Sequence, residues 1–285
     1  MPIEPPVISP TSLDEAYAAL AESAHRPMAG ATDLLVQLTA DLGPPPERVL
    51  YLWRLDALRG IGVDGTDLVI GALTTYTEMR DSALVREHLP VLAAAAATVG
   101  AAQIQNRGTL GGNVANASPA GDTLPVLLAC DAVLVVGSVR GEREVAATDF
   151  FVAYRRTALA TDELLLRVRF PMPATREVRF RKVGTRRAQA ISKVVLALAW
   201  QQDAPDAAWH AVRVALGSVA PVPVRAAATE AVLEGARPTL ATADLAASTL
   251  AGELSPIDDV RSTADYRRAV AARILHRLLR DEDPR

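Results

Sequence analysis

Hydrophobic and polar positions along residues 1–172 predict helices and strands in alternation. Residues 12–15 (SLDE) have the pattern of a capping box and predict a helix that runs to about Ser23. Residues 75–78 (TYTE) form a second capping box. The other expected elements, in chain order, are a strand at 26–29, a helix at 34–38, a strand at 49–53, a hairpin of 61–63 with 68–70, helices at 91–101 and 123–130, a hairpin of 132–136 with 144–145, and a strand at 164–170.

The pattern changes after Pro171-Met172-Pro173, which we take as the domain boundary. Longer strands are expected at 178–183, 192–201 and 209–216, and helices at 225–234, 239–250 and 265–280. Strands followed by helices predict an α+β arrangement. A chain of 285 residues also exceeds the size at which a single core stops growing. We therefore expect two domains, at 1–172 and 173–285.

Composition excludes some partners. The formal net charge is −3 and aromatic residues make up 4% of the chain, which gives no reason to expect nucleic acid or an anionic membrane. The apolar run at 91–99 is far shorter than the roughly 20 residues needed to span a bilayer. Residues 1–12 are proline-rich and lack the basic and apolar runs of a signal peptide, so we expect a cytoplasmic protein.

Two glycine-containing segments, residues 29–34 (AGATDL) and 109–122 (TLGGNVANASPAGD), are suited to binding a diphosphate. We expect the glycines at 108, 111, 112 and 121 to take positive φ and let the backbone approach a ligand. The side chains of Thr109, Asn113, Asn116 and Ser118 are short donors, whereas Asp122 is suited to accept hydroxyl protons of a sugar or ribityl chain. Together these groups predict a dinucleotide site. The alternative is ordinary turn chemistry on the surface.

The glycine segments match neither common nucleotide-binding fingerprint. No Gly-x-Gly-x-x-Gly occurs there, and no Walker lysine follows. Cys130, the only cysteine, has apolar neighbours and is expected to be buried; one cysteine excludes a disulfide or an all-cysteine cluster within this chain. The four histidines show no metal-ligand spacing.

Four segments together resemble the FAD-binding medium subunits of the molybdenum hydroxylases, the group of xanthine dehydrogenase and carbon monoxide dehydrogenase. The resemblance covers nearly the whole chain, and the second segment is the most specific. The segments are residues 29–35 (AGATDLL), 105–122 (QNRGTLGGNVANASPAGD), 162–171 (DELLLRVRFP) and 181–191 (RKVGTRRAQAI).

This resemblance implies an α+β fold. It consists of an FAD-binding domain of the vanillyl-alcohol-oxidase type, with subdomains at about 1–55 and 56–172, and a C-terminal domain made of an antiparallel sheet and helices. In this family the two glycine segments hold the FAD pyrophosphate, and the third and fourth segments bring a leucine and a lysine to the flavin ring. The implied cofactor-binding residues are Ala29, Gly30, Ala31, Thr32, Asp33, Leu34, Thr109, Gly111, Gly112, Asn113, Asn116, Asp122, Leu165 and Lys182.

The resemblance also implies electron transfer within a heteromer. A large partner subunit would hold the molybdopterin centre and a small partner subunit two [2Fe–2S] clusters, while FAD in this chain passes electrons to NAD or another acceptor. Lys182 would stabilise negative charge on the reduced flavin; Lys193 is the only other lysine. Arg186 and Arg187 either contact an incoming nicotinamide dinucleotide or, the favoured interpretation, are solvated. No catalytic residue or metal ligand is expected here.

One position departs from the family pattern. Relatives commonly have Gly-Gly or Gly-Asn where this chain has Gly30-Ala31. Because positive φ costs alanine on the order of 1 kcal/mol, we expect negative φ at Ala31.

Two other functions stay open at this point. The chain is alternatively a self-sufficient flavin oxidase of the vanillyl-alcohol-oxidase type, although we identify no motif for a covalent flavin anchor and 285 residues leave little room for a substrate cap. It is alternatively a non-catalytic nucleotide-binding subunit. The substrate of the complex, its electron acceptor and its stoichiometry are not specified by this chain's sequence.

Overall fold

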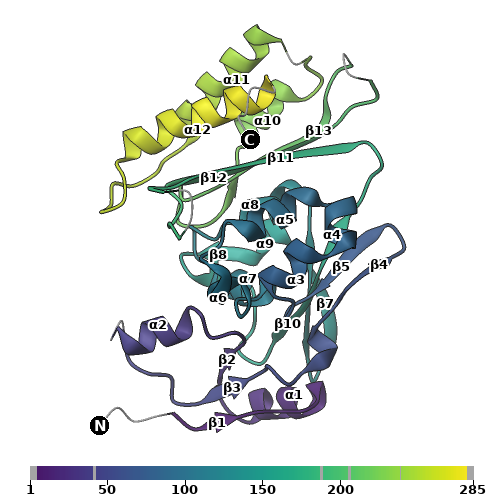
Figure 1. Ribbon diagram of the computed structural model, residues 1–285, viewed down its shortest axis with the longest axis vertical. Helices are drawn as coiled ribbons and strands as arrows, with labels where there is room; N and C mark the ends of the chain where they lie inside the picture. Colours follow the sequence, from purple (N-terminus) through teal and green to yellow (C-terminus); the bar gives the residue numbers. More distant parts are fainter. Residues whose placement is uncertain (1–4, 41–42, 187–188, 205–206, 238, 281–285) are drawn as a thin grey trace.

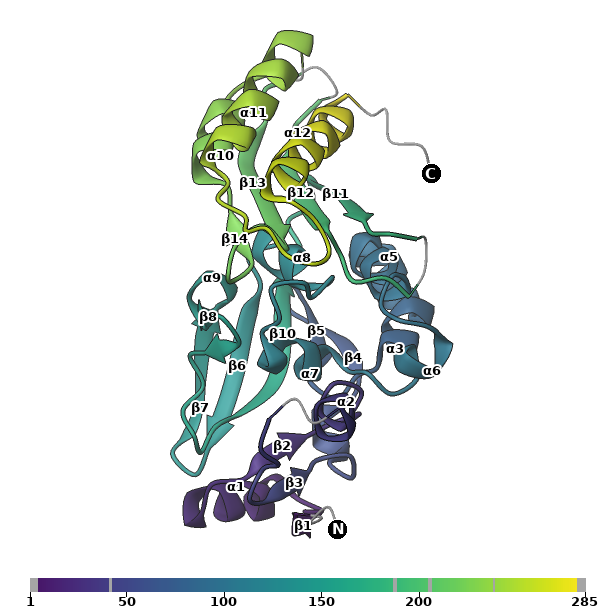
Figure 2. The same ribbon diagram turned by 90° about the vertical axis from the view of Figure 1, so that its left-hand side faces the viewer.

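The computed structural model describes residues 5–40, 43–186, 189–204, 207–237 and 239–280. Three parts follow one another along the long axis of the molecule, from the N-terminal elements through a middle part to a C-terminal sheet with its helices (Figure 1). Figure 2 shows the same order after a quarter turn, with α2 below α7 in both views. No helix in the described ranges combines the length and the apolar character that a membrane crossing requires.

The N-terminal part is a small parallel sheet with two short helices. Ser12 begins α1 as expected, because its Oγ accepts the backbone N–H of Glu15 at 3.2 Å. The sheet order is β1-β3-β2. The elements are β1 (Val7–Ile8), α1 (Leu13–Glu22), β2 (Arg26–Met28), α2 (Leu34–Thr39), β3 (Val49–Tyr51) and the 3₁₀ turn η1 (Asp56–Leu58).

The middle part packs helices against an antiparallel sheet of order β4-β5-β10-β6-β7. The capping box at Thr75 and Glu78 and both predicted hairpins are confirmed. The elements are β4 (Ile61–Asp64), β5 (Asp67–Gly71), α3 (Tyr76–Asp81), α4 (Ala83–His88), α5 (Pro90–Ala97), α6 (Ala102–Gln105), α7 (Leu110–Asn116), α8 (Leu124–Ala129), β6 (Val133–Ser138), β7 (Gly141–Ala146), α9 (Ala147–Phe150), β8 (Phe151–Ala153), β9 (Arg156–Thr157) and β10 (Leu164–Pro171).

One predicted helix is shorter than expected. The helix predicted at 91–101 ends at Ala97, and the chain becomes helical again only at Ala102. Gly100 lies between them with φ of +55°, a left-handed conformation that interrupts a right-handed helix. Gly100 and Ala101, between the two helices, line a cleft of the candidate site.

The C-terminal part is an antiparallel sheet of order β11-β12-β13-β14, with helices on its outer face. Every strand and helix predicted beyond residue 173 is present, with shifts of a few residues at the ends. The α+β fold class is therefore confirmed. The elements are β11 (Arg176–Val183), β12 (Val194–Gln201), β13 (His210–Gly217), β14 (Val224–Arg225), α10 (Ala227–Leu233), α11 (Leu240–Glu253) and α12 (Ala264–Leu279).

Strand β12 is buried on both faces, with large side chains on one and small ones on the other. Leu196, Leu198 and Trp200 pack into the core beneath α10–α12, whereas Ala197 and Ala199 pack into the core of the middle part. Figure 1 shows the sheet between α10–α12 on one side and α5 and α8 on the other. The alanines let the helices of the middle part lie close against the sheet.

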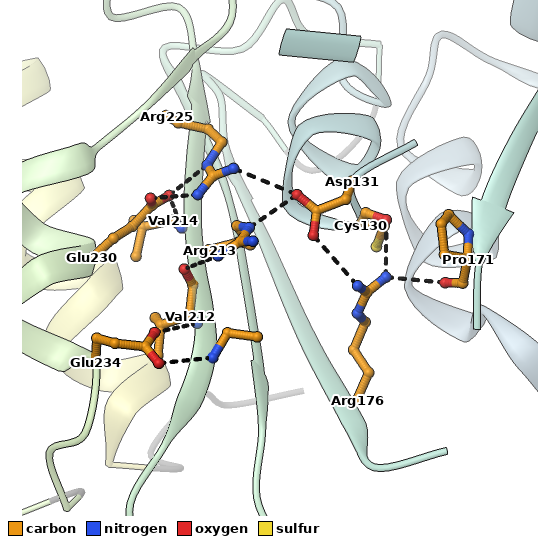
Figure 3. A network of polar contacts seen from close by, with 11 residues as sticks. Cys130, Asp131, Pro171, Arg176, Val212, Arg213, Val214, Arg225, Glu230 and Glu234 are labelled. Atoms are coloured by element: carbon orange, nitrogen blue, oxygen red, sulfur yellow. Dashed lines mark hydrogen bonds and ion pairs between the residues drawn. The ribbon is translucent and has the colours of Figure 1, made fainter. Parts of the chain in front are cut away.

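A group of arginines also joins the sheet to the middle part (Figure 3). Asp131, just after α8, accepts Nε of Arg213 at 2.9 Å and lies 3.4 Å from nitrogens of both Arg176 and Arg225. Arg176 also donates to the carbonyls of Cys130 at 2.8 Å and Pro171 at 3.0 Å. Each of these arginines comes from a different strand of the C-terminal sheet.

Candidate functional site

The two glycine-containing segments lie in direct contact. A Cβ added to Gly30 would stand 1.6 Å from the carbonyl oxygen of Arg107, so only glycine fits at that position. A Cβ added to Gly112 would lie 3.9 Å from Cβ of Ala29. Two stretches about 80 residues apart in the sequence are therefore neighbours in space, as the dinucleotide prediction requires.

The second segment is more helical than expected. Residues 110–116 form α7, whose first turn contains Gly111 and Gly112. Thr109 Oγ1 caps this helix by accepting the N–H of Gly112 at 3.0 Å. The prediction of positive φ at the glycines 108, 111, 112 and 121 is wrong. The turn chemistry left open as the alternative occurs at the C-terminal end of α7, where Ala117 has φ of +47°.

The prediction of negative φ at Ala31 is also wrong, because its φ is +63°. The carbonyl of Ala31 accepts the N–H of Leu35 at 3.0 Å, so the left-handed residue turns the chain into α2. The cost, on the order of 1 kcal/mol, is compensated by the contacts around it. Position 31 therefore keeps the conformation that glycine or asparagine adopts readily, although the residue is alanine.

The glycines of the second segment differ in what surrounds them. A Cβ on Gly111 would meet the Cβ of Ala72 at 2.6 Å and its carbonyl oxygen at 2.7 Å, and a Cβ on Gly108 would meet the Tyr76 ring at 2.8 Å. These two glycines allow α7 to pack against the protein itself. A Cβ on Gly112 would meet only the Thr109 hydroxyl closely, at 2.9 Å. Gly112 is thus the glycine with space for a ligand beside it.

Side chains of the two segments are held by partners that sequence reasoning missed. Asn113 Oδ1 accepts Oγ1 of Thr123 at 2.7 Å. Asn116 Oδ1 accepts Nη1 of Arg155 at 2.8 Å, and the same nitrogen lies 3.5 Å from Oδ2 of Asp33. Thr32, before α2, and Leu34, its first residue, complete the first segment, and both are partly exposed. Arg155 carried no sequence signal because it belongs to neither segment.

Asp122 and Lys182 form a buried ion pair. Lys182 Nζ lies 2.6 Å from Asp122 Oδ2 and also donates to the Thr98 carbonyl at 2.9 Å. Ser192 Oγ donates a short hydrogen bond to Asp122 Oδ1, and Thr98 Oγ1 lies 3.4 Å from Oδ2. The side chains are only 7% exposed for Asp122 and 9% for Lys182. Both carboxylate oxygens that we expected to face sugar hydroxyls therefore already accept protein donors.

Burial raises the pKa of Asp122, while the Lys182 ammonium and the hydroxyls of Ser192 and Thr98 oppose that rise. No local pattern indicated Ser192 as a partner of Asp122, because the two are 70 residues apart and meet only when the C-terminal sheet packs on the middle part.

The structure also has a cleft of about 290 Å³. It is formed by residues at the start of α6 and just before it, and by residues between β11 and β12; its lining residues are Gly100, Ala101, Gln103, Ile104, Gln189, Ala190 and Ile191. Thr98 and Ser192, which contact Asp122, adjoin the two lining segments in the chain. Sequence reasoning missed this cleft, although the segment 181–191 contains one of its walls.

Leu165 and Arg186 each have partners within the fold. Leu165 is buried in the core that includes α7 residues and pairs with Val136 in the sheet. Arg186 donates to the carbonyl of Gln189 at 3.0 and 2.7 Å, so it supports the segment that lines the cleft. Arg187 lies outside the described residues.

The other reactive groups are elsewhere or are shielded. Cys130 is fully buried, as predicted, and burial raises the pKa of its thiol to about 12. Among the residues described, no group of three or more His, Cys, Asp or Glu side chains is placed to hold a metal ion. A second recess, of about 440 Å³, contains Arg59, Arg167 and Arg169 in its lining and includes none of the candidate residues.

Comparison with known proteins matches both parts of the chain. The family described as FAD binding domain in molybdopterin dehydrogenase matches residues 2–173, and the CO dehydrogenase flavoprotein C-terminal domain matches residues 179–281. The nicotinate dehydrogenase FAD-subunit of Eubacterium barkeri is 34% identical over 242 residues, 82% of this chain and 81% of that subunit. The carbon monoxide dehydrogenase medium chain of Hydrogenophaga pseudoflava is 32% identical over 278 residues, 95% of this chain and 94% of that one.

The fold of this chain is also found in solved structures. A chain in the solved structure of carbon monoxide dehydrogenase from Hydrogenophaga pseudoflava, which lacks the Mo-pyranopterin moiety of its molybdenum cofactor, superposes with a TM-score of 0.92. The two chains are 30% identical, and the match covers 97% of this chain and 96% of that one.

Proposed function

We propose where the FAD diphosphate and the flavin ring lie in this chain, which belongs to the family of FAD-binding medium subunits of the molybdenum hydroxylases. The chain is the FAD subunit of a heteromeric oxidoreductase with a small iron–sulfur subunit and a large molybdenum subunit. The diphosphate lies between residues 29–34 and the start of α7. The observation that carries this is the contact of Gly30 with the Arg107 carbonyl.

The residues present fit a dinucleotide diphosphate. A Cβ on Gly112 would closely meet only the Thr109 hydroxyl, with Ala29 Cβ at 3.9 Å, and Asp33, Asn116 and Arg155 group at the ends of α2 and α7. Oxygens of a diphosphate need N–H and hydroxyl donors, which backbone and side chains at these positions supply. The proposed diphosphate residues are Ala29, Gly30, Ala31, Thr32, Asp33, Leu34, Thr109, Gly111, Gly112, Asn113 and Asn116.

We place the flavin ring near Lys182, in the cleft whose lining segments adjoin Thr98 and Ser192 in the chain, and the family resemblance adds Leu165 as a neighbour of the ring. Of the three N–H donors of Lys182, two are accounted for by Asp122 and the Thr98 carbonyl, so one remains for a ligand. Asp122 and the Thr98 carbonyl hold the ammonium in place. FAD supplies the redox chemistry, accepting electrons from the [2Fe–2S] clusters of a partner chain and delivering them to NAD or another acceptor.

The first experiment tests FAD binding itself. We expect the purified chain to show a flavin spectrum, and Gly112→Val to fold but lose it, because a branched side chain enters the space beside Ala29. Gly62→Val is the matched control, since a Cβ there meets nothing within 4 Å and Gly62 lies in β4. Gly111→Val is unsuitable, because it would strike the Ala72 backbone. Full flavin occupancy in folded Gly112→Val would contradict the proposed position.

The second experiment separates electron transfer from self-sufficient oxidation. We expect the isolated FAD-loaded chain to pass electrons from NADH to an artificial dye, and to oxidise N-heterocycles or aldehydes only after the iron–sulfur and molybdenum subunits are added. Substrate turnover by the chain alone would favour the self-sufficient oxidase. Absence of bound flavin, with nucleotide bound instead, would favour the non-catalytic subunit.

Two further predictions from the sequence belong to this proposal. A domain boundary at Pro171-Met172-Pro173 is supported by family matches that end at residue 173 and resume at residue 179. The division of the first domain into subdomains at about 1–55 and 56–172 stays a prediction. Limited proteolysis followed by mass spectrometry checks the boundary. A cytoplasmic location of the complex is checked by cell fractionation.

A further inference from the structure

Arg155 connects the two segments that we assign to the FAD diphosphate. It lies in the turn between β8 and β9, outside both segments. Its Nη1 donates to Asn116 Oδ1 at 2.8 Å, at the end of α7, and lies 3.5 Å from Asp33 Oδ2, at the start of α2. One guanidinium therefore touches both sides of the proposed site.

The backbone at Arg155 is in an unusual conformation. Its φ is +51°, the left-handed region that costs a non-glycine residue about 1 kcal/mol. An exposed ion pair contributes little, about 0–1 kcal/mol, so the contact with Asp33 alone offers a weak reason to maintain that conformation. Strained residues of this kind concentrate at ligand sites.

The guanidinium keeps unused donors. Arginine presents five N–H groups, and the contacts with Asn116 and Asp33 involve Nη1 alone. Within the described part of the chain, Nε and Nη2 of Arg155 have no hydrogen-bond partner. The side chain is 38% exposed. A phosphate is the ligand that best matches such a planar, forked cation.

We propose that Arg155 is a ligand of the FAD diphosphate and holds the two segments around it, an inference that rests on the proposed location of FAD. Arg155 supplies positive charge where the other proposed residues supply neutral donors and the Asp33 carboxylate. The contact with Asn116 fixes the orientation of the guanidinium, and the donors on Nε and Nη2 bind phosphate oxygens. Asp33 then neutralises the part of the guanidinium that faces away from the phosphates.

The test compares Arg155→Met with Arg156→Met in the FAD-free full-length chain. Arg156 is the adjacent, exposed arginine, and its side chain has no hydrogen bond or ion pair among the described residues. Both variants lose one positive charge. Titrations with FAD, with ADP and with riboflavin measure the dissociation constants, and thermal unfolding without ligand measures the stability of each variant.

We expect Arg155→Met to weaken FAD and ADP binding by about tenfold or more, as loss of a charged hydrogen bond does, and to leave riboflavin binding unchanged. Arg156→Met should change all three affinities less than twofold. Equal FAD affinities in the two variants would overturn the inference. So would a loss for riboflavin as large as for FAD, or a lower melting temperature that accounts for the loss, because Arg155 would then only support the fold. Wild type that binds no flavin contradicts the proposed function instead.

Discussion

Two aspartates at opposite ends of α8 join the middle part to the C-terminal sheet in different ways. Asp122, before the helix, is buried and pairs with the single cation Lys182, with Ser192 as a further donor. Asp131, after the helix, is about one third exposed and faces three arginines (Figure 3). The same type of side chain thus makes an enclosed contact at one end and an open network at the other.

The two contacts differ in how much stability is lost when one partner is removed. A buried pair depends on both partners, because either charge left alone in a dry environment is costly. A partly exposed aspartate with several arginines has redundant partners and is partly screened by solvent, so each arginine contributes little. The enclosed contact lies beside the proposed flavin site, where a fixed charge is useful. The open network lies where only attachment of the sheet is required.

The largest effect is expected from Lys182→Met. Asp122 then remains buried without its cation, and we expect a loss of about 3–5 kcal/mol in the free energy of unfolding, measured by urea titration. The double variant Asp122→Asn with Lys182→Met should lose less than the single one. Lys193→Met is the matched control; this lysine lies 4.9 Å from the Tyr266 ring centroid, and its loss should cost about 0.5–1 kcal/mol. Similar losses for the two lysines would remove the contrast between enclosed and open contacts.

The Lys182→Met effect should depend on pH. Burial raises the folded-state pKa of Asp122, and Lys182 opposes this in the wild type. A raised folded pKa contributes stability that is complete below the unfolded pKa, about 4, and is lost as the pH rises through the folded value. Without Lys182 that pKa rises further. We therefore expect the stability difference between variant and wild type to grow from about pH 4 to neutral pH, measured by urea unfolding across this range. A difference that shrinks towards neutral pH would contradict this.

Ser192→Ala tests the second donor of the enclosed contact. Ser192 is buried and donates to Asp122 Oδ1, so its loss leaves an acceptor less satisfied. We expect a loss of about 1–3 kcal/mol in the free energy of unfolding. Ser248→Ala, at an exposed position of α11, is the control and should be neutral or slightly stabilising. Equal stability of the two variants would show that Lys182 alone satisfies Asp122.

The smallest effect is expected in the open network. Arg213→Met removes the 2.9 Å contact with Asp131 but leaves Arg176 and Arg225 near the same carboxylate. We expect a loss of about 0.2–1 kcal/mol that largely disappears in 1 M NaCl, where the Debye length is about 3 Å. The Lys182→Met loss should persist in the same salt, because that pair is buried. Calorimetry at low and high salt compares the two.

Local pattern was enough to place most elements and the candidate segments. The helices at the two capping boxes, the hairpins of the middle sheet and the strands and helices after residue 173 depend on neighbouring residues, and the structure confirms them. Local pattern failed to give the backbone conformation at Ala31 and the reason for glycine at position 111. Ala31 is left-handed because it turns the chain into α2, and Gly111 is needed because α7 packs on Ala72 rather than because it needs positive φ.

The sequence by itself determined the order of elements, the α+β class and the two glycine-containing segments, since periodicity, capping residues and glycine content are local properties. Only the tertiary structure decided which distant side chains share a site. Arg155 reaches Asp33 across 122 positions, and Ser192 reaches Asp122 across 70. Such pairs form because hydrophobic packing of strands and helices brings their backbones together. No pattern within a single segment indicates which distant residue will lie beside it.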